Sequence, residues 1–590
     1  MSSSPAHPSH RLRRPGASLA AALLAVLAAA PAAFAAGGHS HPPVPGGDAD
    51  VPAPAATAGA ASDGRLAPLL EGMGDLHFPI STDVPLAQRY FDQGLVLAYG
   101  FNHAEAERSF REAARRDPDC AICWWGAALV LGPNINAPMN PNDVARTWSV
   151  LHTARELAAR NGGADERERA YIEALSTRYA EQPPEDRSAL DLAYAGAMRE
   201  VARRFPADLD AQVLFAEALM DTMPWDYWQE DGSAKPATEE VLATLDSVIA
   251  RDADHPGANH LKIHAVEVHY PERGLESARN LADAVPGAGH LVHMPSHIYL
   301  NLGMYHEATA ANLRAVASDR DYLVQCHAQG LYPVSYASHN LHFLWAAATQ
   351  EGRSALAIET AEKIAARLEG EYESELRGET AGSAQHFWIT PLYARVRFGR
   401  WDEVLAVPEP PSDFHYPRGV WHYAQGLALT RKGRLEEARG HLEELTAVSA
   451  EPALEGMTFW DMNLLTDLLG VARHVLAGEI AAGSGDFETA IRELEAGVAA
   501  EDALNYDDPP DWHHPVRQVL GAVLLAAGRP ADAERVYRED LERRPHNGWS
   551  LYGLHASLEA RGETEEAAAA AERFAEAWRH ADVELTSSRL

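Results

Sequence analysis

Glycine and alanine recur as a pair, five residues apart, along the second half of the chain. The pairs are Gly303 and Ala308, Gly352 and Ala357, Gly433 and Ala438, Gly485 and Ala490, Gly528 and Ala533, and Gly562 and Ala567. Gly399 and Gly433 are 34 residues apart, and so are Gly528 and Gly562. A period near 34 is typical of helix–turn–helix repeats, in which each unit buries its apolar face against its neighbours. The spacing predicts an all-α solenoid, with loops inserted where the interval is longer.

The segment 90–120 carries a fuller form of this pattern. Its characteristic residues are Gly94, Ala106, Phe110, Ala113 and Pro118, at the spacings of the tetratricopeptide repeat (TPR) signature. From about residue 86 to the C-terminus the chain resembles TPR proteins, and it is similar to exported bacterial ones that carry the segments HPGANHLKIHAVE and HMPSHIYL. The resemblance implies a right-handed superhelix of about eight to ten hairpins, whose first helices line a concave groove that can bind a protein or peptide.

Length and charge limit the classes of partner. The chain has 590 residues, which is too many for one compact core. Its formal net charge of −35 would repel phosphates, so nucleic acid is excluded as a partner and anionic membrane surfaces are disfavoured. An acidic protein of this kind attracts cations and basic ligands instead.

The first 35 residues have the composition of a secretory signal peptide. Arg11, Arg13 and Arg14 precede an apolar run at 17–30, and an A-x-A cleavage site ends at Ala35. The run is shorter than the roughly 18–20 residues that span a membrane, and no later segment is a candidate span. We expect export to the periplasm or the extracellular space, by the general or the twin-arginine route.

Composition divides the rest of the chain. Residues 36–64 are rich in Ala, Gly and Pro, which predicts a disordered linker. Residues 65–590 are expected to form the solenoid, with His-rich central repeats at 255–345 and regular repeats at 385–580. The aromatic segment 223–228 falls between helices, and is predicted either to cover one face of the array or to plug a repeat junction.

Two of the three cysteines form a C-x-x-C motif. Cys120 and Cys123 follow a proline at the start of a predicted helix, and outside the cytoplasm this spacing favours a disulfide. A redox pair or free buried thiols are the alternatives, and zinc is disfavoured because it usually takes four ligands. Cys326 is left without a partner.

Histidines are concentrated in the central repeats. His260 and His264 are four residues apart, His293 and His297 are four apart, and the second pair follows the first by 33 residues. An interval of four places two side chains on one helix face. Because adjacent helices pack roughly 8–10 Å apart, pairs on neighbouring first helices could converge on one metal ion. His260, His264, His293 and His297 are therefore the predicted ligands of a transition metal such as zinc, copper or iron.

Further residues share this face. Counting back fourteen residues from each turn glycine defines position 1 of a first helix. His260, His264 and Glu267 then take positions 5, 9 and 12, His290, His293 and His297 take positions 2, 5 and 9, His339 and His342 take 2 and 5, and His386 takes 2. In the TPR family these positions line the groove. Glu267 is a candidate further ligand, orienting partner or general base, and the other groove histidines are candidate outer ligands.

Two other readings of the histidines stay open. The groove could be a polar surface that responds to pH or binds a peptide without metal, or the histidines could be structural. No H-E-x-x-H, nucleophile-elbow, phosphate-loop or dinucleotide motif is present, so no reaction class and no nucleotide or organic cofactor is predicted. Pro295 lies between His293 and His297 and predicts a kink there, or a helix that begins at Pro295 and leaves His293 on a loop.

Overall fold

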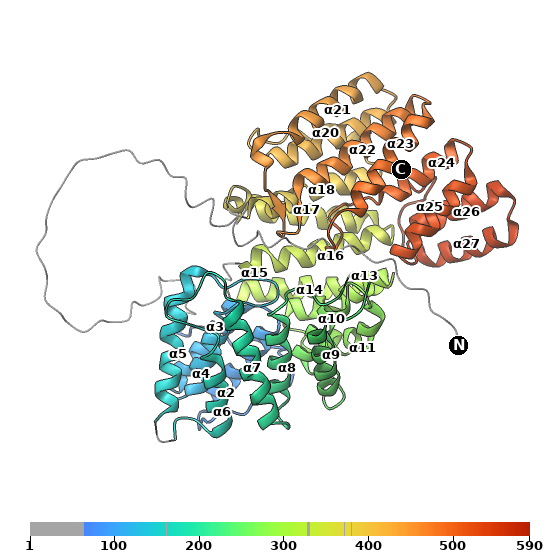
Figure 1. Ribbon diagram of the computed structural model, residues 1–590. Helices are drawn as coiled ribbons and strands as arrows, with labels where there is room; N and C mark the ends of the chain where they lie inside the picture. Colours follow the sequence, from blue (N-terminus) through green and yellow to red (C-terminus); the bar gives the residue numbers. More distant parts are fainter. Residues whose placement is uncertain (1–63, 161, 230, 327–330, 371, 379) are drawn as a thin grey trace, which may run out of the picture.

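The computed structural model describes residues 64–590 except 161, 230, 327–330, 371 and 379. These residues form an array of helical hairpins, which confirms the predicted all-α solenoid (Figure 1). The predicted signal peptide at 1–35 and linker at 36–64 lie outside the described residues, apart from residue 64. In the described part of the chain, no helix combines the length and apolarity needed to cross a membrane.

Five hairpins form the N-terminal part, drawn in blue to green in Figure 1. They are α2 (Pro85–Tyr99) with α3 (His103–Arg116), α4 (Ala121–Leu129) with α5 (Val144–Ala158), α6 (Glu166–Leu175) with α7 (Ser188–Arg204), α8 (Leu209–Met220) with α9 (Pro236–Ile249), and α10 (Pro256–Val266) with α11 (Leu275–Ala284). Short 3₁₀ helices at Pro141–Asp143 and Pro271–Gly274 precede α5 and α11. Cys120 and Cys123 form a disulfide at the first turn of α4, and Cys326 is buried and free.

Two hairpins form the central part. The first pairs α12 (Gly289–His293) and α13 (Pro295–Asn301) with α14 (Tyr305–Cys326), and the second pairs α16 (Tyr336–Gln350) with α17 (Ser354–Gly370). The short helix α15 (Leu331–Val334) leads into α16. A 3₁₀ helix at Glu373–Leu376 follows α17.

Five hairpins form the C-terminal part, drawn in orange to red. They are α18 (Ala381–Arg397) with α19 (Trp401–Ala406), α20 (His415–Arg431) with α21 (Leu435–Ser449), α22 (Leu465–Gly483) with α23 (Phe487–Asp502), α24 (Val516–Ala526) with α25 (Pro530–Arg543), and α26 (Gly548–Arg561) with α27 (Thr564–Ala577). A 3₁₀ helix at Pro452–Leu454 and a small antiparallel ribbon, β1 (Thr458–Phe459) with β2 (Asn463–Leu464), lie between α21 and α22. The twelve hairpins exceed the eight to ten expected, because those between 121 and 284 lack the Gly–Ala pair.

The turn glycines have the conformation that their spacing predicts. Gly303, Gly352, Gly399, Gly433, Gly485, Gly528 and Gly562 all have φ between 64° and 84°. This left-handed region costs glycine little and lets the chain reverse between two helices. The alanine five residues later in each pair is buried in the second helix.

Close packing between repeats uses one arrangement at both ends of the array. The ring of Phe110 lies between Gly94 and Gly126, where an added Cβ would come within 2.8 Å and 2.4 Å of it. Tyr537 lies in the same way between Gly521 and Gly553, and in both cases the ring is 16 residues after the first glycine. This repeated packing makes the chain a TPR-like repeat protein.

The C-terminal repeats turn back onto the central ones. The Nε1–H of Trp549 donates to the carbonyl of Thr349 at 3.1 Å, and the backbone N–H groups of Ser354 and Ala355 donate to the carboxylate of Asp582 at 2.6 and 3.0 Å. These contacts join segments about 200 residues apart. Loops from both ends of the chain are therefore brought together over the central helices.

Candidate metal centre

Six histidines meet where the inner helices α10, α12, α13 and α16 face one another. Five of them are almost fully buried, and His339 is half-buried. They form two groups of three, each with one ring nitrogen per residue within 4.8 Å of the others. We call His260, His264 and His290 triad A, and His293, His297 and His339 triad B.

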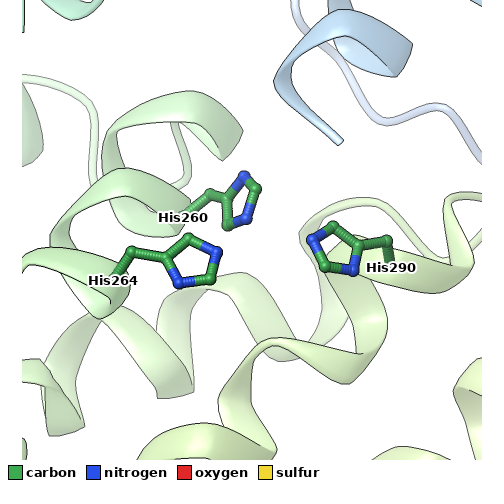
Figure 2. Close-up of side chains that lie close together, drawn as sticks. All are labelled: His260, His264 and His290. Atoms are coloured by element: carbon green, nitrogen blue, oxygen red, sulfur yellow. The ribbon is translucent and has the colours of Figure 1, made fainter. Parts of the chain in front are cut away.

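Triad A joins α10 to α12. The ring of His260 lies 4.8 Å from that of His264 and 5.1 Å from that of His290, measured between centroids. Figure 2 shows His260 and His264 on one helix, facing His290 across a gap. His290 comes from the next repeat, so the triad forms only when the two repeats pack together.

Hydrogen bonds fix the rings of triad A from behind. The Nδ1 of His260 lies 2.5 Å from the carbonyl oxygen of Tyr99, and the Nδ1 of His264 lies 3.1 Å from Oε1 of Glu267. Since both neighbours can only accept, each Nδ1 carries the proton and each Nε2 keeps its lone pair. The Nε2 atoms of both residues and both ring nitrogens of His290 are buried without a hydrogen-bond partner. Three buried lone pairs thus face one point, as a metal site requires.

Triad B joins α12 and α13 to α16. Its centroids are 4.8 Å apart for His293 and His297, 4.9 Å for His293 and His339, and 5.6 Å for His297 and His339. The Nδ1 of His293 lies 2.7 Å from Oδ1 of Asn312, which again directs Nε2 inward. The Nε2 atoms of His293 and His297 are 2.9 Å apart, so they share a proton or a cation.

Glu267 lies between the two triads. Its Oε1 contacts Nδ1 of His264, and its Oε2 lies 2.9 Å from Nδ1 of His297. Burial would raise the pKa of this carboxyl, but the charges and hydrogen bonds of His297 and His264 lower the pKa to about 2. A carboxylate held in this way is a weak base, and both of its oxygens are engaged by imidazoles. The geometry fits an orienting partner rather than the candidate general base.

Protonation differs between His297 and the other rings. Burial lowers the pKa of His260, His290, His293 and His339 well below its usual value, and it lowers the pKa of His264 as well. Burial also acts on His297, but Glu267 and Asp508 outweigh it and raise its pKa to about 9. At neutral pH, five of the six imidazoles are neutral and available as ligands.

The helix is interrupted at Pro295, as the sequence indicates. α12 ends at His293 and α13 begins at Pro295, with Met294 between them in a helical conformation (φ −49°, ψ −37°). His293 therefore lies on a helix and not on an entering loop. The four histidines expected to surround one point are divided, with two in each triad.

Two of the predicted groove residues lie apart from the triads. His342 stacks on Trp345, and its ring lies 5.7 Å from that of His386. The Nδ1 of His386 shares a hydrogen bond with the hydroxyl of Tyr416, and burial lowers its pKa to about 3. This pair occupies the next interface along the array, between α16 and α18.

Asp508 completes the centre, and the sequence analysis missed it. Its Oδ2 lies 3.5 Å from Nδ1 of His297 and accepts hydrogen bonds from Asn301 and Tyr506, at 2.9 and 3.0 Å. Asp508 belongs to the loop between α23 and α24, whose sequence NYDDPPDWHHP is the densest run of acids, aromatics and histidines in the C-terminal half. That density was the only indication available.

Strained backbone is concentrated around the histidines. Of the five non-glycine residues with positive φ in the described chain, Phe101, Trp225, Trp460 and Asp461 lie here. Phe101 packs against all three rings of triad A, with centroids 4.6–6.0 Å away, and Trp225 lies 5.1 Å from His264. Such conformations cost of order 1–3 kcal/mol each and are found mostly at functional sites.

A cavity of about 810 Å³ opens over the centre. Its walls include the loop 135–138, Trp225, α15 and its link to α16, the start of α18, and the segments 455–462 and 506–508. Five carboxylates line it, from Glu267, Glu455, Asp461, Asp507 and Asp508, and its described lining holds no lysine or arginine. The cavity has the size of a small-molecule site and a charge that favours cations. Trp225 thus faces the cavity, while Tyr227 and Trp228 of the same loop are buried in the repeat junction.

The molecule is therefore a TPR-like repeat protein with a buried histidine cluster that could hold a metal. No protein-family model and no curated protein sequence matches the chain. Among solved structures it is similar to the TPR domain of P58(IPK), at 10% identity over 81% of this chain and 99% of that one, with a TM-score of 0.22. It is also similar to a human IFIT1 dimer with m7Gppp-AAAA (12% identity, 84% and 91% covered, TM-score 0.26) and to Cut9–Hcn1 of the APC/C (9%, 84% and 88%, 0.27). At these TM-scores the similarity supports no argument, and the description of the fold rests on the chain's own hairpins.

Proposed function

We propose that the protein binds transition-metal ions, of zinc, copper or iron, through the histidines of its central repeats. The observation that carries this proposal is the fixed tautomer of the rings. Tyr99, Glu267 and Asn312 each hold an Nδ1–H, so that the Nε2 lone pairs of His260, His264 and His293 point into one buried space. Metal-binding histidines have this arrangement, in which an outer acceptor orients the ring and raises its basicity. A set of purely structural histidines would use both nitrogens in hydrogen bonds.

Export is part of the same proposal. The N-terminal sequence favours secretion, and we infer that the protein works in the periplasm or outside the cell, with its signal peptide cleaved near Ala35. The disulfide between Cys120 and Cys123 supports an oxidising compartment. Fractionation of cells and mass measurement of the mature chain test this point, and an intact N-terminus on cytoplasmic protein would refute it.

The test of metal binding is elemental analysis of protein purified from the exported fraction. The full-length wild type is compared with His264→Ala and His297→Ala, and with His152→Ala as the control, because His152 is exposed on α5. We expect at least one ion per chain in wild type and control, and a loss in the two site variants. Sub-stoichiometric metal in the wild type, before and after incubation with each ion, would refute the proposal.

The second candidate is a scaffold that binds a protein or peptide without metal, as the concave surfaces of TPR-like arrays can do. The dimensions of the cavity argue against a peptide at the histidines, because about 810 Å³ suits a small molecule. The large apolar side chains that are exposed in the described chain, such as Leu192 and Val324, are scattered. Capture of one partner by metal-free protein, lost on changing groove residues, would favour this candidate.

A further inference from the structure

The two triads are built by the same rule. Triad A takes positions 5 and 9 of one repeat (His260 and His264) and position 2 of the next (His290). Triad B takes positions 5 and 9 of that next repeat (His293 and His297) and position 2 of the following one (His339). The same construction therefore occurs twice in succession, one repeat apart.

The triads are neighbours but do not merge. His264 and His297 have ring centroids 5.6 Å apart, and those of His290 and His293 are 5.7 Å apart. Glu267 occupies the space between them on the Nδ1 side and gives one oxygen to each triad. Three imidazoles are a complete protein ligand set for one ion with an open position. A single ion would leave three buried imidazoles without a role.

We propose that the centre is dinuclear, with one copper ion in each triad, bound as Cu(I). This inference rests on the proposed metal-binding function and specifies its number and kind of ion. Imidazole nitrogen suits copper. The charge of the site selects the monovalent state, because the carboxylates in contact with the triads belong to Glu267 and Asp508 and carry two negative charges together. Two Cu(I) ions would neutralise them, whereas two divalent ions would leave two uncompensated positive charges in a buried site.

The surroundings fit ions that reach the centre from the cavity. His264, Glu267, His290, His297 and His339 all line the 810 Å³ cavity, so each triad has at least one ligand on its wall. The acidic lining would draw cations toward this end. On the other sides, Phe101 covers triad A, and Phe343 contacts all three rings of triad B with centroids 4.5–4.9 Å away. These rings exclude water from the bound ions.

The test is an anaerobic titration of the full chain with Cu(I), in competition with a chromophoric chelator. His290→Asn removes a ligand from triad A alone, and His339→Asn removes one from triad B alone. We expect two ions in the wild type, one in each variant, and two in the exposed control His152→Asn. The ion kept by the untouched triad shows that the variant is folded. If one variant unfolds by circular dichroism, the other still distinguishes one site from two.

Each other outcome overturns a defined part. One ion in the wild type that both variants lose would refute the dinuclear centre and leave the proposed function standing. No Cu(I) and no Zn(II) in the wild type would refute both. Two Zn(II) ions bound as tightly as two Cu(I) ions would refute the selection of a monovalent ion.

Discussion

Replacing Glu267 by glutamine tests whether one carboxylate orients both triads. The substitution preserves the shape of the side chain and removes its charge. Glutamine offers one oxygen and one NH₂ group, whereas the carboxylate accepts from His264 at 3.1 Å and contacts His297 at 2.9 Å. One imidazole N–H must therefore face the NH₂ group, so that its ring turns or changes tautomer. The other keeps an acceptor, but loses the added strength of a charged one.

The expected magnitude follows from this count of acceptors. Loss of an outer partner of a metal-binding histidine typically weakens the ion about 10–100-fold. That change corresponds to about 1.4–2.7 kcal/mol of binding free energy. We expect a loss of this size in the triad that faces the NH₂ group and a smaller one in the other, so the two affinities of Glu267→Gln should separate.

The assay is a competition titration of wild type and variant with the same ion and chelator. Glu272→Gln is the matched control, because Glu272 is exposed in the 3₁₀ helix Pro271–Gly274 and carries the same change five residues away. Circular dichroism and thermal unfolding establish that both variants are folded. Wild-type affinity for both ions in Glu267→Gln would refute the orienting role of this residue.

Three further predictions concern packing, pH and metal removal. Gly126→Ala would place a Cβ about 2.4 Å from the ring of Phe110 and should cost about 1–3 kcal/mol in urea unfolding, while Gly196→Ala, with nothing within 4 Å, should gain about 0.5–1 kcal/mol; equal stabilities would contradict the packing account. In metal-free protein, the stability due to His297 is present below its usual pKa of 6.5 and is lost as the pH rises through about 9, while that due to Glu267 is present above 4.5 and is lost as the pH falls toward 2. The free energy of unfolding should thus fall from pH 6.5 to 9, by more in wild type than in Glu267→Gln, and equal slopes would count against this account. Chelation of the metal should lower Tm, since free ion at 100 times its Kd adds about 2.7 kcal/mol, and an unchanged Tm would show that the folded protein gains nothing from the ion.

The fold could be predicted from the sequence because its determinants are local and periodic. A glycine at each turn and an alanine five residues later are required by the geometry of one hairpin, so their spacing is visible without knowledge of the rest. Phe110 and its two flanking glycines follow the same logic. Hairpins α4–α5, α6–α7 and α8–α9 were harder to predict because their turns use other residues and longer loops.

The centre could be predicted only in part, for the same physical reason. Helical periodicity placed the histidines on one face, but it did not specify which ring of one repeat meets which ring of the next. Asp508 reaches His297 from a loop more than 200 residues later, and Phe101 reaches triad A from the turn between α2 and α3. Such contacts depend on how the whole array closes, and no period in the sequence records them.

The pairing of rings follows one rule at three successive interfaces. A histidine at position 5 contacts a histidine at position 2 of the next repeat: His260 with His290 at 5.1 Å, His293 with His339 at 4.9 Å, and His342 with His386 at 5.7 Å. The first two interfaces also have a histidine at position 9, and they form the triads. The third has Ala346 there. The position-9 side chain is therefore what separates a pair from a triad.

The rule predicts that Ala346→His would build a third triad with His342 and His386. Ala346 is half-buried and lines a separate cavity of about 140 Å³, which gives a larger side chain room. Both nitrogens of His342 are buried without a hydrogen-bond partner, while Nδ1 of His386 is held by Tyr416, so at least two lone pairs are available. We expect one more Cu(I) ion per chain than in the wild type, and loss of that ion alone on adding His386→Asn. Ala346→Asn serves as the control for the change in size. An unchanged ion count in folded Ala346→His would show that the position rule does not create a site, and that the triads depend on Glu267 as much as on their histidines.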